Sequence, residues 1–347
     1  MFTSFIWNDR YCGYGDFEIN LSLPEPGKPS PLDYLSVGYY LVLKGSVHVM
    51  VVEDFQISST VDKGDTLKVT GRSLESLLDR RVVWNKTVLT GNFQNGVKRL
   101  LNENAISPTN QARQIPGLVF RDSVDPAITA LEINTQFYGE GLYDAILTLC
   151  TEQQLGFRIV LEGTQMIFEL YDGVDRSDSQ TVRPMIEFSG RMDNLSGSNY
   201  TFSMAGFKNV AKVVDKMETV VDDEDPPVVT EVTIDDTATG LNRREVFYNT
   251  SGISKTYEDG TDIPANVYLS QLQQEGLEGL YATTNFEVFD GELDATHEYI
   301  YGRDFLLGDI VQFENAYNMR STVRVVEVIR SQEISGERII PSFSTVT

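Results

Sequence analysis

The sequence predicts a β-rich α+β chain of several domains, in which two related antiparallel β-domains flank an α+β module. Three observations support this fold class. The chain has 347 residues, of which 41% are hydrophobic and 10% aromatic, so it can form two or three separate cores. Alternating polar and apolar residues, typical of strands, dominate its two ends, whereas amphipathic helical segments occur in its middle. A strand followed by a glycine and an apolar stripe also occurs twice.

The clearer of these two patterns lies at residues 64–81. Apolar residues alternate with polar ones up to Gly71, which predicts a strand with one buried face that ends where the glycine turns the chain. We expect Ser73 to cap a short helix that carries three leucines, at i, i+3 and i+4, as one apolar stripe. Residues 200–214 repeat this order less distinctly, with Gly206 at the turn. A duplicated β-domain explains the repeat, and a chance similarity is the alternative.

The first β-domain is predicted at residues 1–84. Residues 17–23 alternate and precede a proline-rich loop, and residues 39–43 and 47–52 form a predicted hairpin across a short loop. The segment reads as roughly five or six strands with no long helix between them, which is typical of a small antiparallel barrel or sandwich.

An α+β domain is predicted at residues 85–179. Residues 96–101 and 141–150 have the apolar spacing of amphipathic helices, and residues 156–161 and 166–171 read as a hairpin. We interpret this domain as an insertion between β-domains.

The second β-domain is predicted in two pieces, residues 180–250 and 284–347. Between them we expect a helical insertion at residues 251–283, because leucines recur at helical spacing after Pro264. The strands expected in the last piece are residues 286–293, 299–301, 309–314, 322–331 and 338–343.

The net charge of −23 is concentrated in the middle of the chain. Residues 201–300 contain 20 acidic and 6 basic side chains, and residues 221–228 are expected to form a charged, exposed loop. This balance argues against tight binding of phosphate groups, which requires clustered Lys and Arg. Two interpretations remain: an acidic face that keeps the protein soluble, or a repulsive lining past which nucleic acid moves without binding.

The sequence predicts no membrane-spanning segment, since no apolar run approaches the roughly 20 residues that a membrane helix needs. The N-terminus lacks the basic and apolar regions of a secretory signal, so we expect folding in a cytoplasm. Cys12 and Cys150 are far apart in the sequence and are expected to be free, structural thiols.

The sequence contains no strong catalytic, cofactor-binding or metal-binding motif, and we assign no residue to these roles. Of its two histidines, His48 lies in an alternating apolar segment and is expected in the core, while His297 has no second histidine at zinc-binding spacing. The carboxylates of residues 172–178 resemble a calcium loop only loosely, so a solvated turn is the main interpretation and calcium the lesser one. We therefore expect a protein that is not an enzyme and needs no cofactor.

Two further patterns are equally unspecific. Gly139 and Gly141 flank Glu140 at a predicted helix start, but the strand and third glycine of a dinucleotide site are missing. Glu231 and Asp235 could be drawn as a glycosidase pair, although 51 acidic residues produce such pairs by number alone.

Three segments carry a resemblance to a known family. They are Trp7-Asn8-Asp9-Arg10-Tyr11 with Gly15-Asp16-Phe17-Glu18-Ile19, then Gly71-Arg72-Ser73-Leu74-Glu75-Ser76-Leu77-Leu78-Asp79-Arg80-Arg81, and Asp304-Phe305-Leu306-Leu307-Gly308-Asp309-Ile310-Val311. The chain resembles, over nearly its whole length, the siphophage tail-hub or tail-associated proteins, which are similar in fold to the baseplate hub of contractile tails.

This resemblance implies a homotrimeric ring in which each protomer contributes two related β-barrel tube domains, with α/β modules outside them. Such a ring would cap the tail tube or the distal tail protein ring at the phage tail tip. It would also contact the tape measure protein and receptor-binding or fibre proteins, and DNA would pass through it without specific binding. Longer members carry C-terminal extensions, so a chain that stops at Thr347 is expected to be the bare hub, made in the host cytoplasm.

Two alternatives to the hub remain. A receptor-binding or carbohydrate-binding tail module could use exposed aromatic side chains, such as Tyr39, Tyr40 and Tyr138, to stack on sugars. A cell-wall hydrolase could use a pair of acidic residues.

Overall fold

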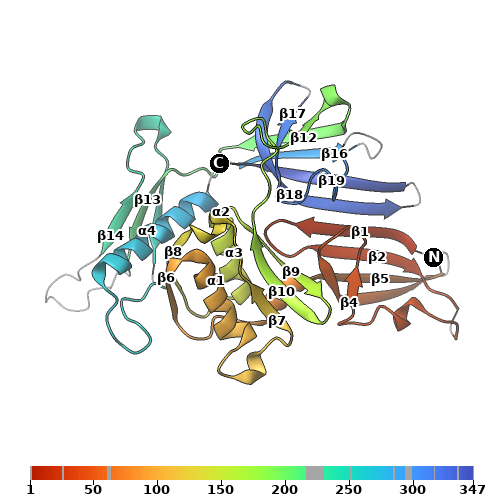
Figure 1. The fold of residues 1–347 in the computed structure, drawn as a ribbon, viewed down its shortest axis with the longest axis horizontal. Coiled ribbons are helices and arrows are strands. Elements are labelled where there is room, and N and C mark those ends of the chain that lie inside the picture. Colours follow the sequence, from red (N-terminus) through yellow and green to blue (C-terminus); the bar gives the residue numbers. More distant parts are fainter. Residues whose placement is uncertain are drawn as a thin grey trace.

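One sheet of eleven strands joins the two ends of the chain (Figure 1). Its N-terminal half contains β1 (Phe2–Arg10), β2 (Asp16–Ser22), β3 (Tyr40–Val42), β4 (Val49–Thr60) and β5 (Gly64–Ser73). Its C-terminal half contains β11 (Glu187–Ser189), β12 (Leu195–Ser203), β16 (Phe286–Leu293), β17 (Ile310–Glu314), β18 (Arg320–Glu333) and β19 (Gly336–Thr345). The computed structural model describes residues 2–25, 27–60, 64–215, 230–250, 252–283, 286–293, 299–315, 317–333 and 336–346.

The two halves meet at the antiparallel pair β1 and β18, where Trp7 lies opposite Arg330. The strand order is β12-β16-β19-β18-β1-β2-β5-β4-β3, with β17 on β18 and β11 on β17. Strand β18 has 14 residues, and one of its edges pairs with a strand from each half of the sheet. Arg320–Arg324 pairs with β17, and Glu327–Glu333 pairs with β1.

This sheet corrects the expectation of two closed barrels. Among the described residues β3 pairs only with β4 and β12 only with β16, so neither half closes on itself. The physical reason is the length of β18: its second half pairs with β19 along one edge, and along the other edge it pairs with β1 rather than with a second strand of its own half. The expected strand at residues 299–301 is also absent from the structure, which has only an isolated bridge between Tyr301 and Phe305 there.

Each half of the sheet has its own core. The N-terminal core is built by side chains that alternate along β1, β2, β4 and β5, as the period-2 pattern predicts; its buried members are Trp7, Phe17, Met50, Val52, Leu67 and Val69. The C-terminal core is rich in aromatic rings, and its buried phenylalanines are Phe188, Phe289, Phe305, Phe313 and Phe343.

An α+β domain packs beside the sheet, and its main helices and hairpin lie where the sequence predicts them. Its elements are β6 (Thr87–Asn92), α1 (Phe93–Leu101), β7 (Leu118–Arg121), α2 (Pro126–Thr129), β8 (Glu132–Phe137), α3 (Leu142–Glu152), β9 (Gly156–Glu162) and β10 (Gln165–Tyr171). Strand β10 pairs with β9 and β7, and β6 pairs with β8. The core of this domain also buries the three predicted leucines Leu74, Leu77 and Leu78.

The helix of those leucines, Leu74–Arg80, is a 3₁₀ helix, and Ser73 does not cap it. The Ser73 hydroxyl instead accepts a hydrogen bond from the backbone N–H of Gly15 at 2.8 Å. Further short helical segments are Pro31–Asp33, Gln111–Arg113, Gly190–Met192 and Gly240–Asn242, which are 3₁₀ helices, and Asn102–Ile106, which is a π-helix.

We call the described residues from Met204 to Thr283 the outer module. It contains β13 (Val210–Val214), β14 (Glu231–Ile234), β15 (Glu245–Asn249) and α4 (Ala265–Ala282), and Figure 1 shows it on the side of the α+β domain away from β1 and β2. Helix α4 covers a three-stranded sheet with a core of its own. The prediction of a helical apolar stripe at residues 210–214 is wrong, because these residues form β13, between β14 and β15.

None of the helices in the described part of the chain has the length and apolarity to span a membrane.

Candidate functional sites

His48 is a core residue, as its alternating segment predicts, with a side chain that is 1% exposed. Its Nδ1 lies 3.3 Å from Oε1 of Glu75, which is fully buried and also accepts the backbone N–H of Ile159 at 2.6 Å. Burial opposes the positive charge of His48, but the facing Glu75 carboxylate outweighs it and raises the histidine pKa. Burial likewise opposes the charge of Glu75, but His48, together with hydrogen bonds from Ser73 and Ile159, outweighs it and lowers the carboxyl pKa. The hydrogen bond from Ile159 on β9 to Glu75 connects residues 1–84 to the α+β domain.

The carboxylates of residues 172–178 face separate partners. Asp172 accepts Arg324 Nη1 at 2.8 Å, Asp175 accepts the backbone N–H of Ser177 at 2.8 Å, and Asp178 pairs with Arg320 at 3.1 Å. No group of three or more metal-binding side chains is found in the described part of the chain.

The other sequence candidates are equally separated. Glu231 pairs with Lys212 at 2.9 Å, whereas Asp235 lines a pocket beside α4. Gly141 precedes α3, so the Gly-Glu-Gly pattern is the predicted helix start. Cys12 and Cys150 are free. His297 and the acidic residues 221–228 lie outside the described residues.

The ends of the eleven-stranded sheet form a candidate assembly surface. Among the described residues no strand pairs with the outer edge of β12, and the nine residues of β12, LSGSNYTFS, include no charged residue and no proline. Open edges in monomeric proteins usually carry charges, prolines or covering loops, because free backbone groups otherwise pair with another chain. The opposite end, at β3 and β4, exposes Tyr40, Val42, Phe55 and Ile57.

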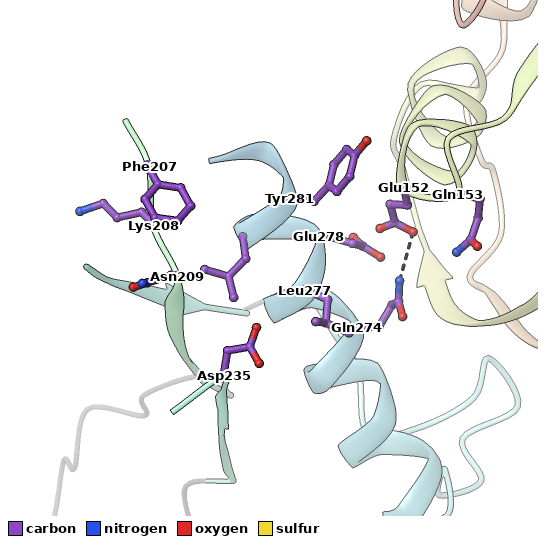
Figure 2. Close-up of a pocket in the computed structure, with 11 residues that line it drawn as sticks. Glu152, Gln153, Phe207, Lys208, Asn209, Asp235, Gln274, Leu277, Glu278 and Tyr281 are labelled. Atoms are coloured by element: carbon purple, nitrogen blue, oxygen red, sulfur yellow. Dashed lines mark hydrogen bonds between the residues drawn. The ribbon is translucent and has the colours of Figure 1, made fainter. Parts of the chain in front are cut away.

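A pocket of about 520 Å³ lies along α4, lined by the end of α3 on one side and by residues 207–209 and Asp235 on the other (Figure 2). Glu152 from α3 and Glu278 from α4 point toward each other there, and Gln274 donates to Oε2 of Glu152 at 3.1 Å. Figure 2 also shows Lys208 across the pocket, with its amine pointing away from the two carboxyls. The remaining lining includes Leu277, half exposed on α4.

The two carboxyls have abnormal titration. Burial raises the pKa of Glu152 to about 10, and its hydrogen bond with Glu278 adds to this effect. Burial also raises the pKa of Glu278. Burial also raises the pKa values of the neighbouring Glu275 and Glu140. Two buried carboxylates that face each other repel, and the raised pKa of Glu152 keeps a proton on the pair at neutral pH.

Sequence reasoning missed this carboxyl pair. Glu152 and Glu278 come from helices far apart in the chain, and neither stands in a motif. The only available signal was the spacing of Gln271, Glu275 and Glu278 along α4, which places acidic and amide side chains on one face of that helix.

Residues 1–343 match the family model described as "Siphovirus ReqiPepy6 Gp37-like protein". The fold is similar to that of the 43 kDa tail protein of prophage MuSo2 from Shewanella oneidensis, with 11% identity, a TM-score of 0.59, and coverage of 99% of this chain and 94% of that chain. It is also similar to the tail protein from Neisseria meningitidis MC58, with 12% identity, a TM-score of 0.58, and coverage of 99% and 91%. No curated protein matches the sequence.

Proposed function

The chain belongs to the Siphovirus ReqiPepy6 Gp37-like family of phage tail proteins, and on that premise we propose that it is a structural hub of a long, non-contractile tail tip. Three copies form a ring that caps the tail tube or the distal tail protein ring, meets the tape measure protein and the receptor-binding or fibre proteins, and conducts DNA during ejection. The hub acts by assembly and catalyses no reaction.

The observation that carries this proposal is the sheet with two different open ends. A contact between unlike edges of two identical chains is heterologous, and such contacts close into a ring when the rotation between copies allows it. The uncharged edge of β12 and the apolar edge at β3 and β4 are such unlike surfaces. In this proposal residues 1–84, together with the strands of 180–250 and 284–347 that belong to the large sheet, supply the two β-units of each protomer. Residues 85–179 and the outer module, which includes 251–283, lie outside the ring.

The negative charge supports passage of DNA rather than its binding. The net charge of −23 repels phosphates within a Debye length of about 8 Å at physiological salt. If carboxylates face the channel, this repulsion keeps the duplex from adhering while it moves.

The assembly is tested by the substitution Phe202→Lys, which places a charge on β12, where Phe202 is 49% exposed. Light scattering and negative-stain microscopy, with and without purified distal tail protein, should show trimeric rings for the unaltered chain and monomers for the variant. Leu241→Lys is the matched control, because Leu241 is 100% exposed in the outer module. Rings formed equally by Phe202→Lys, or a channel too narrow for a duplex, would contradict the proposal.

A receptor-binding or carbohydrate-binding role is a second candidate, favoured by the exposed Tyr39, Tyr40 and Tyr138, of which Tyr138 is 66% exposed. Aromatic faces exposed in this way can stack on sugar rings. A glycan array with host wall polysaccharide distinguishes the two functions: the hub should bind no glycan tightly, whereas a receptor-binding module should lose glycan binding on Tyr138→Ala.

A further inference from the structure

The outer module is attached at a single place in the large sheet. The chain leaves the sheet after Ser203 at the end of β12 and re-enters it at Phe286 at the start of β16, and these two residues are paired. The backbone N–H of Lys208 also donates to the carbonyl of Thr283 at 3.1 Å. Two adjacent strands that carry a module with a core of its own are the geometry of a hinge.

Helix α4 binds its own sheet tightly. Gly276 and Gly279 face that sheet at close range: a Cβ on Gly276 would lie 2.6 Å from Ile234, and one on Gly279 would overlap the ring of Tyr248. Tyr268, Leu272 and Leu280 complete this buried face. The helix and its sheet therefore move as one body.

The opposite face of α4 meets the α+β domain through polar side chains. Gln136 on β8 donates to Oε1 of Gln271 at 3.1 Å, and Gln154 donates to the hydroxyl of Tyr281 at 3.4 Å. Lys86 reaches Ser254 Oγ at 2.8 Å. Val88 of the α+β domain adds an apolar contact with the core of the outer module. An interface made largely of amide and carboxyl groups is less stable than an apolar one of the same area.

Two carboxyl oxygens at this interface lack a donor. Oε1 of Glu152 and Oε1 of Glu278 are both buried without a hydrogen-bond partner, and the two carboxyls point toward each other in Figure 2. The charged and titratable groups around them are Glu275 on α4, Glu140 before α3, Asp235 after β14, Lys208 before β13 and Tyr281 on α4. Lys208 points away from the pair in Figure 2, so its amine does not neutralise the two carboxyls, and a proton held between them would satisfy both unpartnered oxygens.

We propose that the outer module is a hinged arm that docks on the α+β domain through a proton shared by Glu152 and Glu278, so that acid favours the docked position. When the arm swings out, both carboxyls become fully hydrated and titrate near the ordinary value of 4.5, whereas docking raises the pKa of Glu152 to about 10. The shared proton stabilises docking fully at a pH below 4.5. This stabilisation is lost as the pH rises from 4.5 toward the docked-state pKa of about 10. Docking thus takes up one proton across the physiological range and weakens about tenfold per pH unit.

Distances between two spin labels test this proposal in the full-length chain. The labels are placed by Asn95→Cys on α1 and Asn266→Cys on α4, two exposed positions, in a Cys12→Ser background and diluted into excess unlabelled protein. The expected result is a narrow distance distribution at pH 6 and a growing population at longer distance as the pH is raised to 9. Glu152→Gln with Glu278→Gln should remove the pH dependence, because two amides hydrogen-bond to each other without titrating.

A matched pair on one helix sharpens the test. Gln274→Glu adds a third carboxylate to the pair and should release the arm at pH 7.5, with docking restored near pH 5. Gln273→Glu makes the same change on the exposed face of α4 and should leave the distances unaltered, and circular dichroism confirms that each variant is folded. An unchanged distribution in Gln274→Glu, equal release in Gln273→Glu, or unaltered pH dependence in the double glutamine variant would each overturn the proposal.

Discussion

The two segments that look alike in the sequence, residues 64–81 and 200–214, fold differently. In the first, β5 continues through Gly71 to Ser73, and the 3₁₀ helix Leu74–Arg80 follows directly. In the second, β12 ends at Ser203, and residues 210–214 form β13 in another sheet. The same order of strand, glycine and apolar residues therefore produced one compact unit and one passage between two modules.

The surroundings of the two glycines explain this difference. Gly71 lies between Phe17 of β2 and Val52 of β4, and a Cβ there would overlap the carbonyl oxygen of Val51 and lie 2.8 Å from the ring of Phe17. Gly206 is exposed, and a Cβ there would meet no atom within 4 Å. The first glycine permits close approach of strands rather than a turn, and the second simply lies in a loop.

Alanine at the two glycines gives the largest expected contrast. Gly71→Ala should lower the free energy of unfolding by about 3 kcal/mol or more, or prevent folding, because backbone atoms of β4 cannot move aside without breaking the sheet. Gly206→Ala should change it by less than about 0.5 kcal/mol. Urea unfolding followed by circular dichroism measures both. Equal stability of the two variants would remove the distinction between the segments.

The next contrast concerns Glu75, the acidic residue of the first segment. Glu75→Gln leaves the His48 imidazole buried without its carboxylate, and the backbone N–H of Ile159 with a weaker acceptor. Removing one partner of a buried ion pair typically costs about 3 to 5 kcal/mol. We expect that loss in urea unfolding of Glu75→Gln and a smaller one in the double variant His48→Gln with Glu75→Gln. A single variant as stable as the wild type would show that the pair is uncharged.

The same pair predicts a pH profile for the first segment. The pKa of Glu75 is lowered, so its contribution is present above the ordinary value of 4.5 and is lost as the pH falls through the lowered pKa. The pKa of His48 is raised, so its contribution is complete below the ordinary value of 6.5 and is lost as the pH rises through the raised pKa. The melting temperature of the wild type, relative to the double variant, should be highest between these values. A difference that is constant from pH 4 to pH 9 would contradict this assignment.

Local patterns accounted for the elements that were predicted well. Periodic spacing of apolar residues predicts the hairpin of β9 and β10 and the helices α1 and α3. The apolar faces of these elements are the buried ones. Two features had no local signal. The pairing of β1 with β18 depends on the length of β18 and brings together strands from opposite ends of the chain. The Glu152 and Glu278 pair depends on how α4 docks, which the sequence of neither helix encodes.

The smallest contrast uses the second segment, where Lys212 on β13 pairs with Glu231 on β14 at 2.9 Å. Both side chains are about half exposed, so water and salt screen the pair and its formation restricts two flexible side chains. Lys212→Gln should therefore lower the free energy of unfolding by less than about 1 kcal/mol, and raising the salt concentration should shrink even that loss. The comparison with Glu75→Gln in the same urea experiment separates a buried charge that holds two domains together from an exposed one that stabilises only its own sheet. A loss in Lys212→Gln as large as that in Glu75→Gln would mean that β13 carries as much of the stability of the molecule as the first segment does.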